Sequence, residues 1–558
     1  MDRDLWDAAE VAGGLVPAGS VFAFLAEHRR ELFDDSFTAD LFPSRTGRPS
    51  LPADLIGTVL VLKELYALSD PQTADALKYD IRWKVACGRS LTDTSFDPST
   101  LVYWRQRIAA SGRPDRVFDK VAEVITETGI LKGRRKRCVD STVFDDAVAT
   151  QDIVTQLVAA IRKVARLVPG GSGVIAEVCV LDYTRAGKPD IDWDDPQAKA
   201  DLVSTLVNDA GAVLARLCGP GAPQRDPAAA DALGLLALVA GQDVEPADDS
   251  DGTDGQWVIA RKVAPDRVIS TVDPQTRHTR KSKSVRRDGY RAHLATEPET
   301  GLITDAELTM ATGETNTDAA MGVTMANRDR YHPTTTEPGD TSSESAETAE
   351  TAETAETAET AETAETAETA ERSVGGGLEV YGDSAYGSGE ARQAYRQAGH
   401  DTVIKPKPVL PAVPGGFTLD DFVIDHDEQA VTCPAGHTRP ITPARTVTFG
   451  KLCTGCPLRA KCTTAKTGRS MSIHQHEELL RAARAQGRTP EFKQAYPTRS
   501  NVERTVAHVA TQNGRRIKLR HLGVEANNAW LRTRAAALNL RTLLKHGLTR
   551  RDGAWALA

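Results

Sequence analysis

The order of expected elements between residues 378 and 406 constrains the fold more than any other feature. A short apolar segment, residues 378–382, predicts a strand that ends at Asp383. A capped helix is expected over residues 387–399, and a second strand over residues 401–406. A strand, a helix and a second strand in this order are typical of a parallel pair. The sequence therefore predicts an α/β fold built on a mixed sheet.

An earlier segment has the same character. A basic run from residue 131 leads into an apolar strand expected to end at Asp140, with Ser141 and Thr142 behind it. An Asp where a strand gives way to a loop is well placed to hold a ligand. The alternative is a turn-forming or capping Asp, and Asp145 and Asp146 are neighbouring acids that compete for the assignment.

Tyr496, Arg499 and Glu503 stand three and then four residues apart. On an α-helix this spacing places all three side chains on one face. A carboxylate beside a guanidinium and a phenol suits metal-assisted chemistry on a phosphate chain. Alternatively, Tyr496 only packs at a helix start and Arg499 only neutralises Glu503.

The remaining pattern is mostly helical. Residues 1–130 show helical periodicity, with caps at Ser20 and Ser69. Helix pairs of this kind either read a DNA groove or pack as a plain bundle. Residues 148–240 predict an inserted helical layer. Further strands are expected over residues 267–273, 288–295 and 302–310, and the last two form a hairpin.

Charge is unevenly distributed along the 558 residues. The net charge of −9 includes nine Glu from an Ala-Glu-Thr repeat at residues 346–371, which predicts a disordered insertion. From Glu491 onward, 13 Lys and Arg oppose four Asp and Glu, which favours a polyanion-binding surface over a merely solvated one. No apolar run reaches membrane-spanning length and no secretory signal is visible, so we expect a cytoplasmic protein with reduced thiols.

Four of the eight cysteines lie within 30 residues: Cys433, Cys453, Cys456 and Cys462. Cys-x2-Cys with two outlying thiols suits structural Zn²⁺, and His437 could replace one thiol. Reduced structural thiols are the alternative.

The hard oxygens of Asp140, Asp383 and Glu503 instead suit two Mg²⁺ or Mn²⁺ ions that act on a phosphodiester.

Three blocks of residues resemble the catalytic blocks of DDE transposases from bacterial insertion sequences: residues 139–142, residues 382–386, and the set Tyr496, Arg499 and Glu503. Residues 94–107, 453–462 and 539–544 share the resemblance. It implies an RNase H-like domain with a five-stranded mixed sheet and flanking helices, preceded by an all-α N-terminal domain.

The resemblance also implies roles for individual residues. Asp140, Asp383 and Glu503 would be the catalytic, metal-binding triad, with Tyr496 and Arg499 on the DNA. The family usually carries Lys seven residues after the Glu, where this chain has Ala510. The basic residues expected to replace it on DNA are Arg515, Arg516, Lys518 and Arg520.

The expected organisation is a helical DNA-binding or assembly domain at 1–130, a catalytic domain at 131–545 and a tail at 546–558. Insertions are expected at 150–245 (helical), 333–375 (disordered) and 410–475 (Cys-rich). The expected function is transposition of double-stranded DNA at terminal inverted repeats, by a homodimer at the bacterial nucleoid. The alternatives are a nuclease of the same fold and a catalytically decayed DNA-binding copy.

Overall fold

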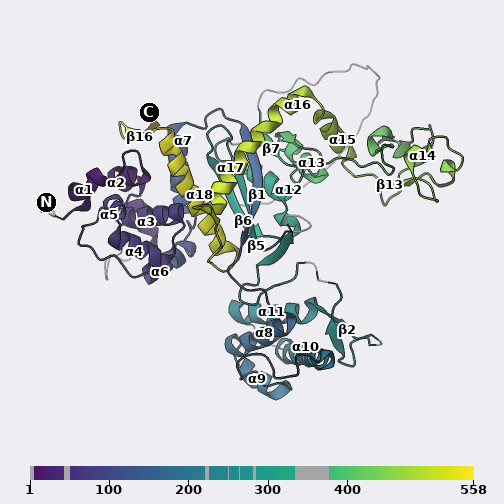
Figure 1. Cartoon of the computed structure of the whole chain (residues 1–558), viewed down its shortest axis with the longest axis horizontal. Helices are drawn as coiled ribbons and strands as arrows, with labels where there is room; N and C mark the ends of the chain where they lie inside the picture. Colours follow the sequence, from purple (N-terminus) through teal and green to yellow (C-terminus); the bar gives the residue numbers. More distant parts are fainter. Residues whose placement is uncertain are drawn as a thin grey trace, which may run out of the picture.

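A mixed sheet lies at the centre of the molecule, with helices on both faces (Figure 1). The computed structural model describes residues 6–42, 51–219, 225–248, 250–262, 264, 266–280, 285–332 and 376–558. Six strands of this part form the sheet: β1 (Lys136–Asp145), β4 (Arg277–Arg280), β5 (Arg286–Thr296), β6 (Ile303–Met310), β7 (Glu379–Gly382) and β8 (Asp401–Ile404). Their order is β4-β5-β1-β7-β8, with β6 also paired to β5. The α/β class is thereby confirmed.

The expected parallel pair is present. β7 runs parallel to β8 and to β1, and α13 (Gly389–Gln397) connects β7 to β8. The Ser388 hydroxyl caps this helix by accepting from the backbone N–H of Ala391. The predicted hairpin is also confirmed, because β5 and β6 pair antiparallel across the turn at Gly301, whose φ of 74° favours glycine.

The sheet has one strand more than the five that the family resemblance implies. β5 is 11 residues long, so its outer edge holds two strands in succession. β6 pairs with residues 290–296, and the short β4 pairs with residues 286–289. The extra strand therefore extends one edge and leaves the order of the other five unchanged.

Two expectations about strands are wrong. Asp140 does not end its strand, because β1 continues to Asp145 through its antiparallel pairing with β5. Residues 267–273 are not a strand. There the Gln242 side chain accepts from the N–H of Val268, and the Gln156 side chain donates to the carbonyl of Val268. Side chains thus satisfy backbone groups that a neighbouring strand would otherwise bind.

The N-terminal region is helical, as predicted. Its helices are α1 (Ala8–Ala12), α2 (Val21–Leu32), α3 (Ala53–Tyr66), α4 (Asp70–Tyr79), α5 (Ile81–Ala86), α6 (Ser99–Ala109) and α7 (Arg116–Thr128). Ser20 caps α2, and Ser69 forms a capping box with Gln72 at α4. These helices share one hydrophobic core with the sheet and with α18 (Val524–Lys545), so the N-terminal region is packed firmly against the sheet.

Two lobes project from this body (Figure 1). The helical lobe contains α8 (Ile153–Leu167), α9 (Gly171–Val178), α10 (Pro196–Cys218) and α11 (Pro227–Gln242), with the hairpin β2 (Val244–Pro246) and β3 (Trp257–Ile259). It has its own hydrophobic core. The Ala-Glu-Thr repeat lies outside the described residues.

The second lobe carries the cysteines and has a separate core around Phe422, Val431 and Phe449. It contains the strands β9 (Val423–Asp425), β10 (Ala430–Thr432), β11 (Thr438–Pro440), β12 (Thr446–Thr448) and β13 (Ser470–Ser472), and the short helix α14 (Arg459–Cys462). α15 (Glu477–Gln486) leads the chain back to the sheet (Figure 1).

The helices over the sheet separate its two faces. α12 (Asp318–Asn327) and α13 cover the face that carries Val139. α17 (Ser500–Ala510) and α18 cover the opposite face, which carries Cys138 and Phe144. The chain ends in the hairpin β16 (Leu548–Arg551) and β17 (Ala554–Leu557). Among the described residues, no helix is long and apolar enough to cross a membrane.

Candidate active site

Strand register brings the first two acids together. In the parallel pair of β1 and β7, Cys138 stands opposite Tyr381. Asp140 and Asp383, which directly follows β7, each come two positions after this pair, and the charge of Asp383 raises the pKa of Asp140. Both carboxylates are half-buried, and each accepts a backbone N–H at 2.9 Å, Asp140 from Ser141 and Asp383 from Ala385.

Glu503 reaches the site from a helical rod that crosses the sheet (Figure 1). The rod consists of α16 (Pro490–Ala495), a 3₁₀ turn (Tyr496–Arg499) and α17. Tyr496 and Arg499 therefore precede the α-helix, which corrects the expectation of a single helix. Pro497 has no N–H to donate, and its ring disfavours regular α-helix at this position. The chain tightens there and then continues as α17.

Arg499 connects the sheet to the helix. Its guanidinium lies 3.3 Å from the Asp140 carboxylate and 3.0 Å from the Glu503 carboxylate. The Arg499 side chain is 15% exposed and that of Asp140 17%, whereas Glu503 is 60% exposed. One cation thus binds a half-buried acid on β1 and a solvent-facing acid on α17.

The electrostatics of the site reflect this crowding of like charges. Burial raises the pKa of Asp140, the Arg499 guanidinium opposes that rise, and the carboxylates of Asp383 and Glu503 add to it. Burial favours loss of the Arg499 proton, but the charge of Asp140, followed by Tyr496, Asp383 and Glu503, outweighs it and raises the pKa of Arg499. The three predicted acids therefore act on one another within a single site.

Tyr496 packs and also faces the acids. Its ring stacks on Phe492 with centroids 5.2 Å apart and planes at 14°. Burial raises the pKa of the Tyr496 phenol, Arg499 opposes the rise, and the charges of Asp383 and Asp140 reinforce it. Tyr496 therefore packs at the helix start through Phe492, and its phenol also feels the charges of Asp383 and Asp140.

A second tyrosine, Tyr386, ends the family-like block of residues 382–386, and the sequence alone predicts no role for it. It is 1% exposed and follows Asp383 by three residues, within a turn. Burial, with the charges of Asp318 and Asp140, raises its pKa well above the usual range. Any Cβ at Gly382 would come within 2.9 Å of the Tyr386 side chain, so glycine is needed there. The sequence signal for Tyr386 is its position, three residues after an Asp that is expected to end a strand.

The competing acids near Asp140 have other partners. Asp145 pairs with Arg287 at 2.8 Å, and its carbonyl accepts the N–H of Leu519. Asp146 accepts backbone N–H groups just beyond the end of β1. Asp145 and Asp146 therefore have structural partners of their own. Asp140 is the acid of β1 that shares Arg499 with Glu503.

The basic residues after α17 lie on and beside a small hairpin, β14 (Thr511–Gln512) and β15 (Arg515–Arg516). All four predicted DNA-binding residues of this segment are exposed: Arg515, Arg516, Lys518 and Arg520. Arg516 donates to the carbonyl of Val143, which ties the hairpin to β1. Ala510 is 3% exposed and lies in the core, so this helix end does not present a position for a DNA-contacting lysine.

The four clustered thiols line one small hollow of the Cys-rich lobe, together with His437. Burial raises the pKa of Cys462; the Arg469 charge opposes the rise, and the thiols of Cys453, Cys433 and Cys456 reinforce it. The N–H of Arg469 donates to the sulfur of Cys453 at 3.4 Å. Over the whole described part of the chain, no group of three or more His, Cys, Asp or Glu side chains is arranged to hold a metal ion.

Comparison with known proteins gives two family matches. Residues 432–544, which include Tyr496, Arg499 and Glu503, match the family Transposase DDE domain. Residues 14–107 of the N-terminal helices match the family Transposase domain (DUF772). No curated protein and no solved structure matches the chain. Transposase families matched in two separate parts of one chain support a DDE transposase of the insertion-sequence kind, an enzyme that cleaves DNA and transfers its strands.

Proposed function

We propose that this transposase cuts and joins DNA at the terminal inverted repeats of its own element, with Asp140, Asp383 and Glu503 as catalytic residues. The observation that carries the proposal is the position of Arg499 between the carboxylates of Asp140 and Glu503. Asp383 joins them through the register of β1 and β7. Acids 120 or more positions apart in the chain thus share one electrostatic site.

We assign the sheet to the RNase H-like class. The support is its strand order: β6-β5-β1-β7-β8, with antiparallel pairing on one side of β1 and parallel pairing on the other. On this assignment residues 131–545 are the catalytic domain, with insertions at 150–245, 333–375 and 410–475. Residues 1–130 are the DNA-binding or assembly domain, and residues 546–558 are the tail.

The donor set of the three acids fits divalent cations such as Mg²⁺ or Mn²⁺. Carboxylate oxygens are the hard ligands that these ions prefer. Burial and mutual repulsion disfavour the charged form of Asp140, and one guanidinium offsets only part of that cost. Asp140, Asp383 and Glu503 would hold two such ions, which activate the attacking oxygen and stabilise the leaving oxygen of a phosphodiester.

The chain's own groups position the DNA. Arg499 is fixed by two carboxylates, so its planar guanidinium is oriented for a phosphate next to the acids. The Tyr496 ring, held by Phe492, offers a phenol beside it. The exposed cations Arg515, Lys518 and Arg520 extend a positive surface from the end of α17 along the duplex backbone.

We propose a structural Zn²⁺ ion in the Cys-rich lobe on the chemistry of its ligands. Thiolates are soft ligands suited to zinc, and four of them line one hollow at the centre of a lobe whose core is small. Cys433, Cys453, Cys456 and Cys462 would hold the ion, with His437 as the alternative fourth ligand. The role of the ion is to hold the lobe folded.

Assaying cleavage and strand transfer on a duplex that carries the element's end, with Mg²⁺, tests the function. The expected result is both products with the wild-type protein and neither with Asp383→Ala. Cleavage without a joined product identifies a nuclease, and binding without either product identifies a decayed copy. We expect the active form to be a homodimer on the DNA, acting at the bacterial nucleoid, and the mass of the protein–DNA complex tests the dimer.

A further inference from the structure

We infer that the helical lobe carries a second nucleic-acid contact, an arginine-lined hollow that binds backbone phosphates of the DNA outside the catalytic centre. The hollow has a volume of about 630 Å³ and lies between α8, α9 and the loop that follows α9. Arg162, Arg166 and Arg185 line it together with the hydroxyls of Ser172 and Thr184. This inference rests on the proposed function, because it takes DNA as the substrate.

The rim of the hollow is firmly built. Asp209 of α10 is 2% exposed and accepts from the N–H of Val180, the N–H of Leu181 and the phenol of Tyr183. Three hydrogen bonds to one buried carboxylate hold this exposed loop against the lobe. The hollow is therefore preorganised, and binding would not have to order its rim.

Arg162 joins the loop to α8. Its Nε donates to the carbonyl of Tyr183 at 3.0 Å, and its Nη2 donates to the carbonyl of Arg185. Both acceptors are neutral, so the positive charge is oriented without being neutralised. Among the described residues, Arg166 has no carboxylate partner, and Arg185 has only Asp182, at 4.0 Å. Three guanidinium groups thus face one acid in the hollow.

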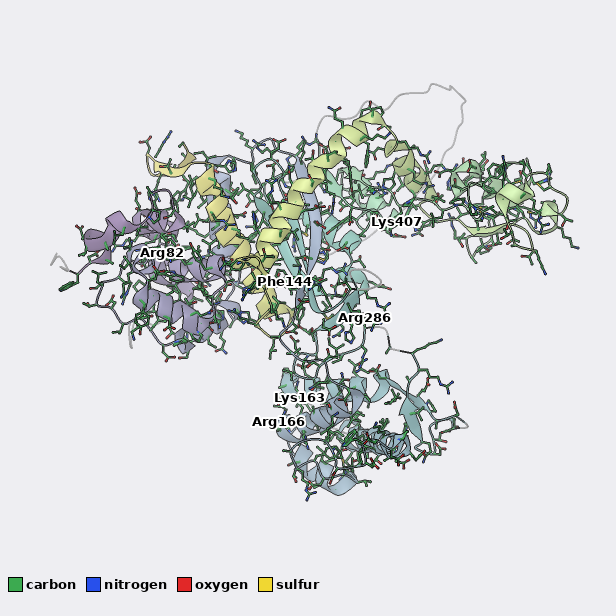
Figure 2. The ribbon with its side chains drawn as sticks, viewed as in Figure 1. Arg82, Phe144, Lys163, Arg166, Arg286 and Lys407 are labelled. Carbon is green, nitrogen blue, oxygen red and sulfur yellow. The ribbon has the colours of Figure 1, made fainter. Side chains whose placement is uncertain are left out.

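This positive charge stands out against the lobe around it. Residues 150–245 contain 13 Asp and Glu and only eight Lys and Arg. Three of those eight line the hollow, and Lys163 lies on the same helix, near Arg166 (Figure 2). A cation such as Arg166 is favoured at the end of α8 by the helix dipole. The dipole does not account for Arg185, which lies in the loop. An otherwise acidic lobe would approach DNA through this hollow.

The wall of the hollow suits the sugar that accompanies each phosphate. Ile175, Cys179 and Leu181 form an apolar side, and Val180 at the rim is 82% exposed. An aliphatic side chain so exposed gains from contact with a deoxyribose face. Arginines beside an apolar wall match the alternating phosphate and sugar of a nucleic-acid strand, whereas a free inorganic anion would use only the arginines.

The test measures how the affinity of the full-length protein for a long duplex depends on salt. Each phosphate contact contributes about 0.9 to the slope of log affinity against log salt. Arg166→Ser combined with Arg185→Ser should therefore lower the slope by about two. The matched control combines Lys199→Ser with Arg216→Ser, two exposed cations of the same lobe that do not line the hollow, and should leave the slope unchanged. Arg162 is left intact because it holds the loop.

Strand cleavage on a short duplex is measured with the same preparations. If the wild type cleaves DNA but the Arg166/Arg185 variant has the slope of the control, the inference fails and the proposed function stands. If the wild type neither binds nor cleaves, both fail. If pyrophosphate or ATP raises the melting temperature of the wild type but not of the variant, while the slopes agree, the hollow binds free phosphate compounds, and the DNA assignment is overturned.

Discussion

The guanidinium of Arg499 lies 3.3 Å from the carboxylate of Asp140, although 359 positions separate the two residues in the chain. The same guanidinium reaches Glu503 at 3.0 Å. A lysine offers a single point charge and cannot hold both acids with a planar fork. We therefore expect Arg499→Lys to lower the cleavage rate by about 10- to 100-fold, because the acids and the phosphate lose their common donor. Single-turnover cleavage at saturating DNA measures this rate. A rate for Arg499→Lys within twofold of wild type would contradict the role of Arg499 as the common donor.

Removing the charge of the acids tests the site directly. Asp140→Asn and Glu503→Gln should each reduce cleavage on the order of 10³-fold, because the neutral amide cannot hold a cation or stabilise the transition state. DNA binding, followed by anisotropy, should remain. The matched control is Asp145→Asn on the same strand, whose carboxylate pairs with Arg287 instead. Equal loss of cleavage in the control would show that the effect comes from damage to β1.

Packing and DNA contact can be separated at Tyr496. Tyr496→Phe keeps the stack on Phe492 and removes only the phenol. If the phenol contacts the DNA, affinity for the element's end should fall by about 1 kcal/mol, roughly fivefold, while the melting temperature stays the same. Tyr496→Ala should lower the melting temperature as well, because the stack is lost. Unchanged affinity in Tyr496→Phe would leave Tyr496 with packing alone.

Local pattern predicted much of this fold, and the errors have physical causes. The capped helices at Ser20, Ser69 and Ser388, the β5–β6 hairpin and the parallel pair at β7 follow from signals within a few residues. The end of β1 does not, because β5 prolongs it to Asp145, and β5 comes more than 100 residues later. Residues 267–273 have strand composition, but glutamine side chains from α8 and α11 take their backbone bonds.

The site was predictable to a similar degree. The family-like blocks pointed to Arg499 and to four residues whose charges act on it in the structure: Asp140, Asp383, Tyr496 and Glu503. The spacing of Tyr496, Arg499 and Glu503 does not distinguish the 3₁₀ turn at Tyr496 from an α-helix, although Pro497 disfavours a regular α-helix there. The sequence predicts no role for Tyr386, because its burial depends on α12, including the room left at Gly322. Nothing local in the sequence shows such tertiary contacts.

The zinc assignment predicts a bound metal and its loss with the thiols. The purified protein should contain about one Zn²⁺ per chain, and Cys453→Ser combined with Cys456→Ser should lose it. Because metal binding would help to fold a lobe with so small a core, chelation should make residues 417–473 sensitive to protease. Cys218→Ser, an exposed thiol of the helical lobe, is the control and should keep the metal. Elemental analysis measures the zinc content of the wild type, the Cys453/Cys456 variant and Cys218→Ser. An equal content in all three proteins would refute the zinc site.

A buried ion pair holds β1, the strand that carries Asp140. Arg137 of β1 and Asp329 are 1% and 2% exposed, and their charged atoms lie 2.6 Å apart. Asp329 also accepts the N–H groups of Tyr331 and His332 at 3.0 Å. Asp329→Asn leaves a buried, unpaired guanidinium and should cost about 3–5 kcal/mol of unfolding free energy.

Glu299→Gln is the comparison variant. Glu299 forms an exposed ion pair with Lys136, which precedes Arg137 on β1. Its loss should cost less than about 1 kcal/mol of unfolding free energy. Urea unfolding followed by circular dichroism compares the two variants with wild type. If both variants lose the same small amount, the Arg137–Asp329 pair does not stabilise β1, and the position of Asp140 depends on the pairing of β1 with β5 and on the packing of Val139 and Phe144.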